Sequence, residues 1–155
     1  MTTKSILALC TFLATTSVFA MQTTYRTSYQ SPGAAAVEGE MKYAPSAGGK
    51  QVKSTAIVSF LGNPNAIEST MDQEWKSAND LESENLSPCA VNGGKLETVV
   101  VKAGAFQACK IHSVSGNVEL TKWVGAVPPN GVIRIDLKKN GVVTREELVE
   151  YDSAL

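Results

Sequence analysis

Apolar and polar residues alternate with a period of two along most of the chain beyond residue 20, a pattern typical of half-buried β-strands. Turn-forming residues interrupt the pattern, including Pro128-Pro129-Asn130-Gly131 and Asn140-Gly141, the dipeptide favoured in tight hairpins. The sequence therefore predicts seven or eight strands joined mainly by short turns. The segments that alternate, or that are rich in β-branched residues, are 24–29, 37–43, 56–61, 96–101, 106–114, 114–120, 132–138 and 142–151.

The period changes after Asn65, where apolar residues recur at spacings of four, four and three, as on one face of a helix. Asn63 or Asn65 can cap the first turn. An apolar stripe that bears one tryptophan is more often a packing surface than a ligand cage. The acidic segment 79–85 is expected to be a solvated loop. The residues of the predicted stripe are Ile67, Met71, Trp75 and Ala78.

Together these elements predict a mainly β (α+β) fold: a curved antiparallel sheet or partly open β-barrel with one helix packed on the concave side. Residues 21–155 are expected to form a single β-rich domain, since 155 − 20 = 135 residues suffice to bury a core. Without Lys4 this domain carries 13 basic and 15 acidic residues and no basic stripe. That balance argues against nucleic-acid binding.

Residues 1–20 read as a cleaved signal peptide, with Lys4 at the head, an apolar run free of acids, and small residues before a cleavage site near Ala20. The alternatives are a membrane anchor and a buried first helix. However, polar residues 15–17 interrupt the run, which falls short of the ~20 residues that span a bilayer. We expect a periplasmic or secreted protein without a transmembrane segment.

Two cysteines, Cys89 and Cys109, remain after signal cleavage, and an exported protein normally joins such a pair in a disulfide. The bridge would add about 3 kcal/mol by closing a loop of about 20 residues in the unfolded chain. A redox pair usually has a spacing of two, and a zinc site would need more ligands than His112 supplies. We therefore predict a structural disulfide, with no metal and no cofactor.

Enzyme chemistry finds little support in the sequence. His112 is the single histidine, and Ser113 beside it would point to the opposite face of a strand, so the two do not form a nucleophile and base pair. Glu146, Glu147 and Glu150 are close together in the sequence, but no pattern indicates that they are buried. We expect these carboxylates to be solvated and the protein not to be an enzyme.

Several segments of the second half carry a family resemblance. They are Val99-Val100-Val101-Lys102-Ala103-Gly104-Ala105-Phe106, Cys109-Lys110-Ile111, Trp123, Val127-Pro128, Gly131-Val132-Ile133 and Glu147-Leu148-Val149-Glu150-Tyr151. In this order they resemble a pattern in uncharacterised bacterial periplasmic proteins that look like relatives of the half-barrel lipoprotein carriers of the LolA and LppX kind. The resemblance covers residues 89–151. It implies a half-barrel fold that carries a lipid-like ligand.

Two functions follow as hypotheses. In the first, the concave face of the sheet binds a lipid or another apolar molecule, with the predicted helix as its lid. In the second, the helix fills the concavity, and a strand edge recruits another envelope protein as a structural or interaction domain. The residues predicted to line the ligand site of the first hypothesis are Trp75, Val100, Phe106, Trp123, Ile133 and Ile135.

Overall fold

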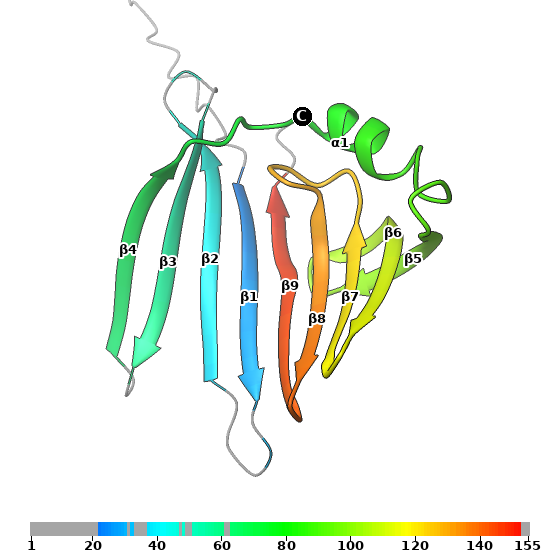
Figure 1. Ribbon diagram of the computed structural model, residues 1–155. Coiled ribbons are helices and arrows are strands. Elements are labelled where there is room, and N and C mark those ends of the chain that lie inside the picture. Colours follow the sequence, from blue (N-terminus) through cyan, green and yellow to red (C-terminus); the bar gives the residue numbers. More distant parts are fainter. Residues whose placement is uncertain are drawn as a thin grey trace, which may run out of the picture.

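The computed structural model describes residues 22–30, 32, 37–46, 48, 51–60 and 63–152. Within them, nine strands form one antiparallel sheet, and one helix, α1 (Ala78–Asn85), lies above the ends of β7 and β8 in Figure 1. The strands are β1 (Gln22–Gln30), β2 (Val37–Pro45), β3 (Val52–Phe60), β4 (Asn63–Met71), β5 (Lys95–Val101), β6 (Gly104–Ser115), β7 (Val118–Val124), β8 (Val132–Lys139) and β9 (Val142–Asp152).

The strand order across the sheet is β4-β3-β2-β1-β9-β8-β7-β6-β5. Chain neighbours pair within β1–β4 and within β5–β9, and the pairing of β1 with β9 joins these two meanders into one sheet. The prediction of a curved antiparallel sheet with one helix is therefore confirmed for the described part of the chain (Figure 1). The predicted signal peptide, residues 1–20, lies outside the described residues.

The register of the strands divides their side chains between two faces. We call the face that carries Tyr25 the inner face; Met41 and Leu148 pair with Tyr25 and therefore share it. The opposite, outer face carries Arg26, which pairs with Glu40 and Glu147. The inner face is mainly apolar and the outer face mainly charged, as expected for an antiparallel sheet that has one face in water.

The hairpin of β5 and β6 covers part of the inner face, and in Figure 1 it passes behind β7 and β8 toward β9. Phe106 packs edge-on against Tyr151 with ring centroids 6.3 Å apart, and the Ala103 amide donates to the Leu148 carbonyl. Ile133 and Leu148 are completely buried beneath this cover. Each such aliphatic side chain contributes about 1.5–3 kcal/mol by burial.

The predicted helix from Asn65 is wrong. Residues Asn63–Met71 form strand β4, which pairs with β3 along its length, and Ile67 is exposed rather than buried on a helix stripe. The predicted lid residue Trp75 lies in the extended segment between β4 and α1. Pairing with β3 supplies hydrogen bonds to the whole segment, and this long-range gain outweighs a local spacing that also fits a helix.

Helix α1 occupies the segment that we expected to be a solvated loop, so that expectation is also wrong. The Ser77 hydroxyl accepts a hydrogen bond from the Asp80 amide, and the Asp80 carboxylate accepts one from the Ser77 amide. This capping box starts the helix, and Leu81 is buried on its one apolar position. No helix in the described part of the chain is long and apolar enough to cross a membrane.

The predicted disulfide joins Cys89 to Cys109, with the two Cα atoms 5.5 Å apart. It links the turn after α1 to the middle of β6, next to the place where the hairpin leaves the sheet. Gly94 lies against the bridge: a Cβ atom at this position would contact the Cys109 sulfur and come within 2.9 Å of the Cys89 sulfur. The bridge is therefore tightly enclosed by the turn that precedes β5.

Candidate functional site

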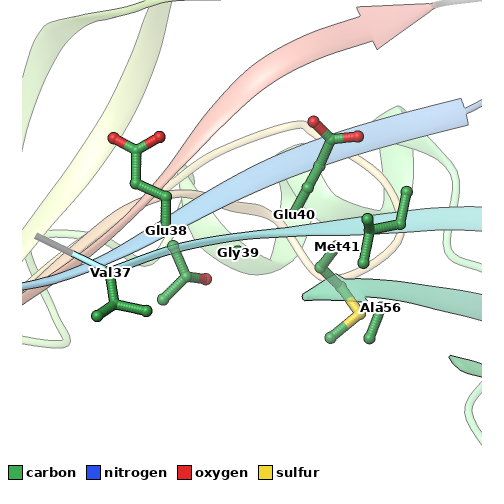
Figure 2. A pocket seen from close by; sticks show the side chains of 8 residues that line it. Val37, Glu38, Gly39, Glu40, Met41 and Ala56 are labelled. Atoms are coloured by element: carbon green, nitrogen blue, oxygen red, sulfur yellow. The ribbon is translucent and has the colours of Figure 1, made fainter. Parts of the chain in front are cut away.

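The part of the inner face that includes the end of β1 and the start of β2 is hollowed and apolar. A cavity of about 260 Å³ lies around Gly39, whose missing side chain leaves a gap between Val37 and Met41. Figure 2 shows Val37, Met41 and Ala56 pointing to one side of the sheet, and Glu38 and Glu40 to the other. The first hollow is lined by Thr27, Val37, Glu38, Gly39, Glu40, Met41, Ala56 and Ile57.

A second hollow of about 290 Å³ lies at the same end of the sheet, against the hairpin of β8 and β9. Leu137 pairs with Thr144, and Lys139 with Val142, so these four side chains share one face. Thr144 lies two residues from Glu146, which pairs with Thr27 of the first hollow. Both hollows are therefore on the inner face. The second is lined by Leu137, Lys139, Asn140, Val142 and Thr144.

Glu146 lies between the two hollows. It pairs with Thr27 on β1 and with Ile135 on β8, and its side chain is half-buried among them. Burial raises the pKa of the Glu146 carboxyl above its usual value, and Lys122 on β7 partly opposes the rise. No ion pair or hydrogen bond to this carboxyl occurs within the described residues. The inner face thus holds an acidic group that is paired with none of the described side chains.

The phenol groups of Tyr25 and Tyr43 lie near Glu146, and their pKa values are also raised. Burial, helped by the charge of Glu146, raises the pKa of Tyr25 and of Tyr43. The Tyr25 hydroxyl donates to the Val132 carbonyl at 2.7 Å, and the two rings meet edge to face at 5.6 Å. These contacts fix the two rings beside Glu146.

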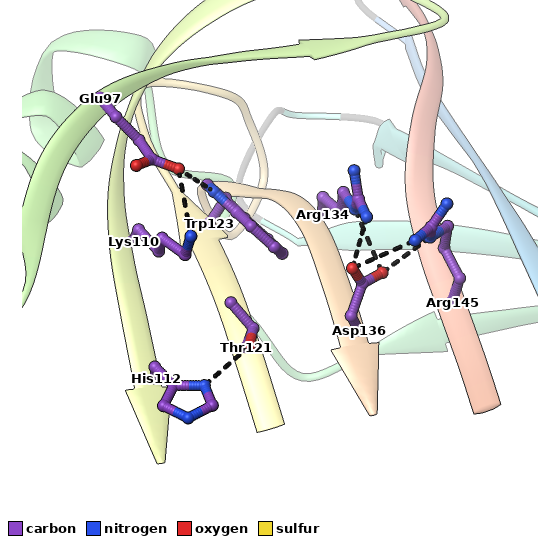
Figure 3. Close-up of polar contacts among 8 residues, drawn as sticks. All are labelled: Glu97, Lys110, His112, Thr121, Trp123, Arg134, Asp136 and Arg145. Carbon is purple, nitrogen blue, oxygen red and sulfur yellow. Dashed lines mark hydrogen bonds and ion pairs between the residues drawn. The ribbon is translucent and has the colours of Figure 1, made fainter. Parts of the chain in front are cut away.

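The outer face carries a network of ion pairs and hydrogen bonds between side chains (Figure 3). Asp136 accepts hydrogen bonds from both Arg134 and Arg145. Burial alone would raise the pKa of Asp136, but these hydrogen bonds lower it below its usual range. Trp123 lies between Lys110 and Arg134, whose charges are 5.2 and 4.8 Å from the ring centroid. Such contacts stabilise a solvated surface. The hollows on this face, of about 190 and 230 Å³, are lined largely by charged side chains such as Arg26, Glu38 and Arg145.

His112 is part of this outer surface. Its Nδ1 lies 3.0 Å from the Thr121 hydroxyl, and the side chain is exposed. Ser113 is in register with Leu120 on the other face, as the strand pattern predicts. The described residues contain no cluster of three or more histidine, cysteine or acidic side chains that could hold a metal ion.

The six residues predicted to line the ligand site do not form one surface. Ile133 is completely buried in the core, and Trp123 lies on the outer face, where its indole NH donates to Glu97 at 2.8 Å. Val100 is 72% exposed on β5, the edge strand. None of these three side chains lines either hollow.

The other three lie nearer the open part of the inner face. Ile135 pairs with Glu146, directly beside the hollows. Phe106 is half-buried against Tyr151 in the hairpin that covers part of the inner face. Trp75 is half-buried before α1, and its Nε1 is buried without a partner among the described residues.

Two signals in the sequence point to the site. The alternation in 37–43 places Val37, Gly39 and Met41 on one face, and a glycine within an apolar strand face indicates a gap. Glu146 has the parity of Thr144 and Leu148, whereas Glu147 does not. The expectation that all three glutamates of β9 are solvated is therefore wrong for Glu146, which is half-buried on the apolar face.

No protein-family model and no curated protein matches the sequence. Among solved structures, the chain is similar to the crystal structure of a LolA superfamily protein from Nitrosomonas europaea, at 8% sequence identity and a TM-score of 0.32. The alignment covers 86% of this chain and 85% of that chain. A likeness at this level does not show membership of that superfamily, so the function rests on the geometry of the site.

Proposed function

We propose that this protein is an exported, non-catalytic binding protein that holds an apolar or lipid-like ligand on the open half of its inner face. The observation that supports this is the pair of hollows on one apolar face, separated by β1 and β9. Together they give one face of the sheet an apolar lining on β1, β2, β3, β8 and β9, whereas the outer face is charged.

The exposure of large apolar side chains supports the same proposal. Val37 is 59% exposed, Ile67 65% and Met71 37%, and all three are in register with the inner face. Val37 lines the first hollow and Ile67 pairs with Ala56, which also lines it, so these two extend the apolar surface beside the hollow, whereas Met71 lies at the far end of β4. The β5–β6 hairpin covers another part of this face, and a bound apolar molecule would do the same for the part around the hollows.

Export is the second part of the proposal. A disulfide is stable in oxidising compartments and rare in the cytosol, and the Cys89–Cys109 bridge fits the former. An oxidising compartment is also what the signal peptide expected at residues 1–20 implies. Mass analysis of the mature protein would test this part, because an N-terminus near residue 21 is expected and an intact Met1 would contradict it.

Binding is tested with the neutral fluorescent probe N-phenyl-1-naphthylamine and the variant Gly39→Leu. Among the described atoms, a Cβ atom on Gly39 would have only the Ile57 carbonyl within 4 Å, at 3.8 Å, so the leucine is expected to fill the first hollow without displacing the described backbone. We expect wild type to bind the probe and Gly39→Leu to bind at least about tenfold more weakly, or about 1.4 kcal/mol.

The matched control is Thr55→Leu, which adds the same side chain to the outer face, where Thr55 pairs with Lys42 and Glu68. This variant should bind the probe like wild type. Equal affinities of wild type and Gly39→Leu would show that the hollow is not the binding site, and a wild type that binds no probe would refute the proposal.

A sheet edge supports a second candidate, an interaction domain for another envelope protein. Strand β4 pairs with β3 alone in the described structure, and residues 65–71 are all exposed. An edge of this length can accept a partner strand. Replacing Ser69 by proline in β4 should abolish capture of such a partner from an envelope extract without changing probe binding.

A further inference from the structure

The charge of the inner face is confined to a few positions. Among the strand residues that the structure describes, Glu146 is the one acid in register with this face, and the bases are Lys122 and Lys139. Lys139 is exposed at the rim of the second hollow. Lys122 pairs with Ile135, which in turn pairs with Glu146. The acid therefore lies at the centre, between the hollows, and the bases lie to one side.

Within the part of the chain that the structure describes, Glu146 also lacks a partner that would offset its burial. Two strand spacings, about 9.5 Å, separate the backbones of Lys122 and Glu146, and no ion pair joins them in the described structure. Tyr25 has its hydroxyl engaged with Val132, and Tyr43 and Tyr151 are neutral phenols whose pKa is raised by burial. A buried carboxylate is costly unless it is paired, and a ligand that covers the hollows would remove its remaining water.

We propose that Glu146 binds the amino group of the ligand, so that the inner face takes a long-chain amine or another amphiphile with a primary ammonium group in preference to a fatty acid. The inference rests on the proposed function and names the class of ligand for that site. An ammonium group supplies both the missing charge and hydrogen-bond donors, the strong pairing for a half-buried carboxylate.

The hydrocarbon part of such a ligand fits the surroundings of Glu146. Thr27 links the carboxyl to the first hollow with Val37 and Met41, and Thr144 links it to the second hollow with Leu137. A chain attached to the ammonium group can therefore enter either hollow directly from the pairing position. A fatty acid bound there would place its own carboxylate beside Glu146, where like charges repel.

The test compares dodecylamine, dodecanol and dodecanoate, each below its critical micelle concentration at pH 7.5, as competitors of N-phenyl-1-naphthylamine. Wild type should bind the amine about tenfold more tightly than the alcohol, because a hydrogen bond to a charged group contributes about 1.5 kcal/mol or more. Dodecanoate should bind no better than the alcohol. Glu146→Gln should reduce the preference for the amine to less than about twofold.

Two further variants control for charge and for folding. Glu147→Gln removes the same charge from the adjacent residue on the outer face, where Glu147 pairs with Arg26 and Arg134, and should keep the preference for the amine. Glu146→Asp retains the carboxylate and should keep most of the preference. Its retention separates a role in ligand pairing from a general effect of substitution at this position.

The outcomes separate the inference from the proposed function. If the three compounds compete equally in wild type, or if Glu146→Gln keeps the preference for the amine, the inference is refuted while the apolar site remains. A preference for dodecanoate that Lys122→Gln abolishes would assign the polar group to Lys122 and also refute it. If none of the compounds displaces the probe, both the inference and the proposed function fail.

Discussion

At the scale of single residues, Glu146 opposes stability in the ligand-free protein. Its carboxyl is half-buried on an apolar face and has no partner among the described residues, whereas the outer-face carboxylate of Asp136 has two arginines. Binding sites commonly retain such unfavourable groups, because the cost to the fold is recovered when the ligand is bound. The same residue should therefore limit stability and determine ligand preference.

Glu146→Gln should raise the melting temperature at pH 7.5. Burial raises the pKa of Glu146 in the folded protein above its usual value of 4.5, so the folded state holds this proton more tightly than the unfolded state. The stability that results is full below the usual pKa and is lost as pH rises through the folded pKa. The advantage of the glutamine should thus shrink as pH falls toward 4, measured by thermal unfolding across this range.

Glu147→Gln again provides the comparison for that experiment. Glu147 pairs with Arg26 and Arg134 on the charged outer face, so its loss should leave the melting temperature unchanged or slightly lower at pH 7.5. A lower melting temperature of Glu146→Gln at pH 7.5 would show that the folded protein stabilises the ionised carboxylate, and it would contradict a destabilising role for Glu146.

At the scale of elements, strands were easier to predict than the helix. Alternation located strands β1 to β3 and β6 to β9, because each has one face in contact with the core, and β-branched residues located β5. Strand β4 was predicted as a helix, because Ile67 and Met71 fit a helix spacing. Its strand conformation is determined by the pairing with β3. Helix α1 has a single buried apolar residue, Leu81, and its recognisable signal is the capping box formed by Ser77 and Asp80.

Ser77→Ala should destabilise the protein by about 1 kcal/mol, because it removes the acceptor for the Asp80 amide at the start of α1. Urea unfolding at equilibrium measures the change. Ser83→Ala is the control in the same helix, where the hydroxyl only donates to the Asn79 carbonyl and its loss should cost little. Equal effects of the two substitutions would contradict the role of the cap.

Removal of the disulfide in Cys89→Ala/Cys109→Ala should cost about 3 kcal/mol, because the bridge closes a loop with a sequence separation of 20 in the unfolded chain. The bridge also fixes the turn after α1 to β6, so the β5–β6 hairpin should lose protection from amide hydrogen exchange before the rest of the sheet. Wild type treated with reductant should behave like the double variant, and unchanged stability in both would refute a structural role for the bridge.

At the scale of the whole molecule, the sequence predicted the class of fold but not the site. The alternation assigns each strand two faces, yet it does not say which half of a face another part of the chain covers. That depends on the β1–β9 pairing and on the path of the β5–β6 hairpin, which are both long-range. Ile133 and Phe106 were therefore predicted to line a ligand site, although one lies in the core and the other in its cover.

The central claim, that the open half of the inner face carries an apolar molecule, is tested most directly by native mass spectrometry of the protein purified from the cells that make it. We expect wild type to retain an additional mass in the lipid range. The Gly39→Leu variant, whose first hollow is filled, should be recovered mainly as the bare chain, and Thr55→Leu should behave like wild type. Recovery of all three proteins as the bare chain, with no added lipid retained on mixing, would contradict the claim.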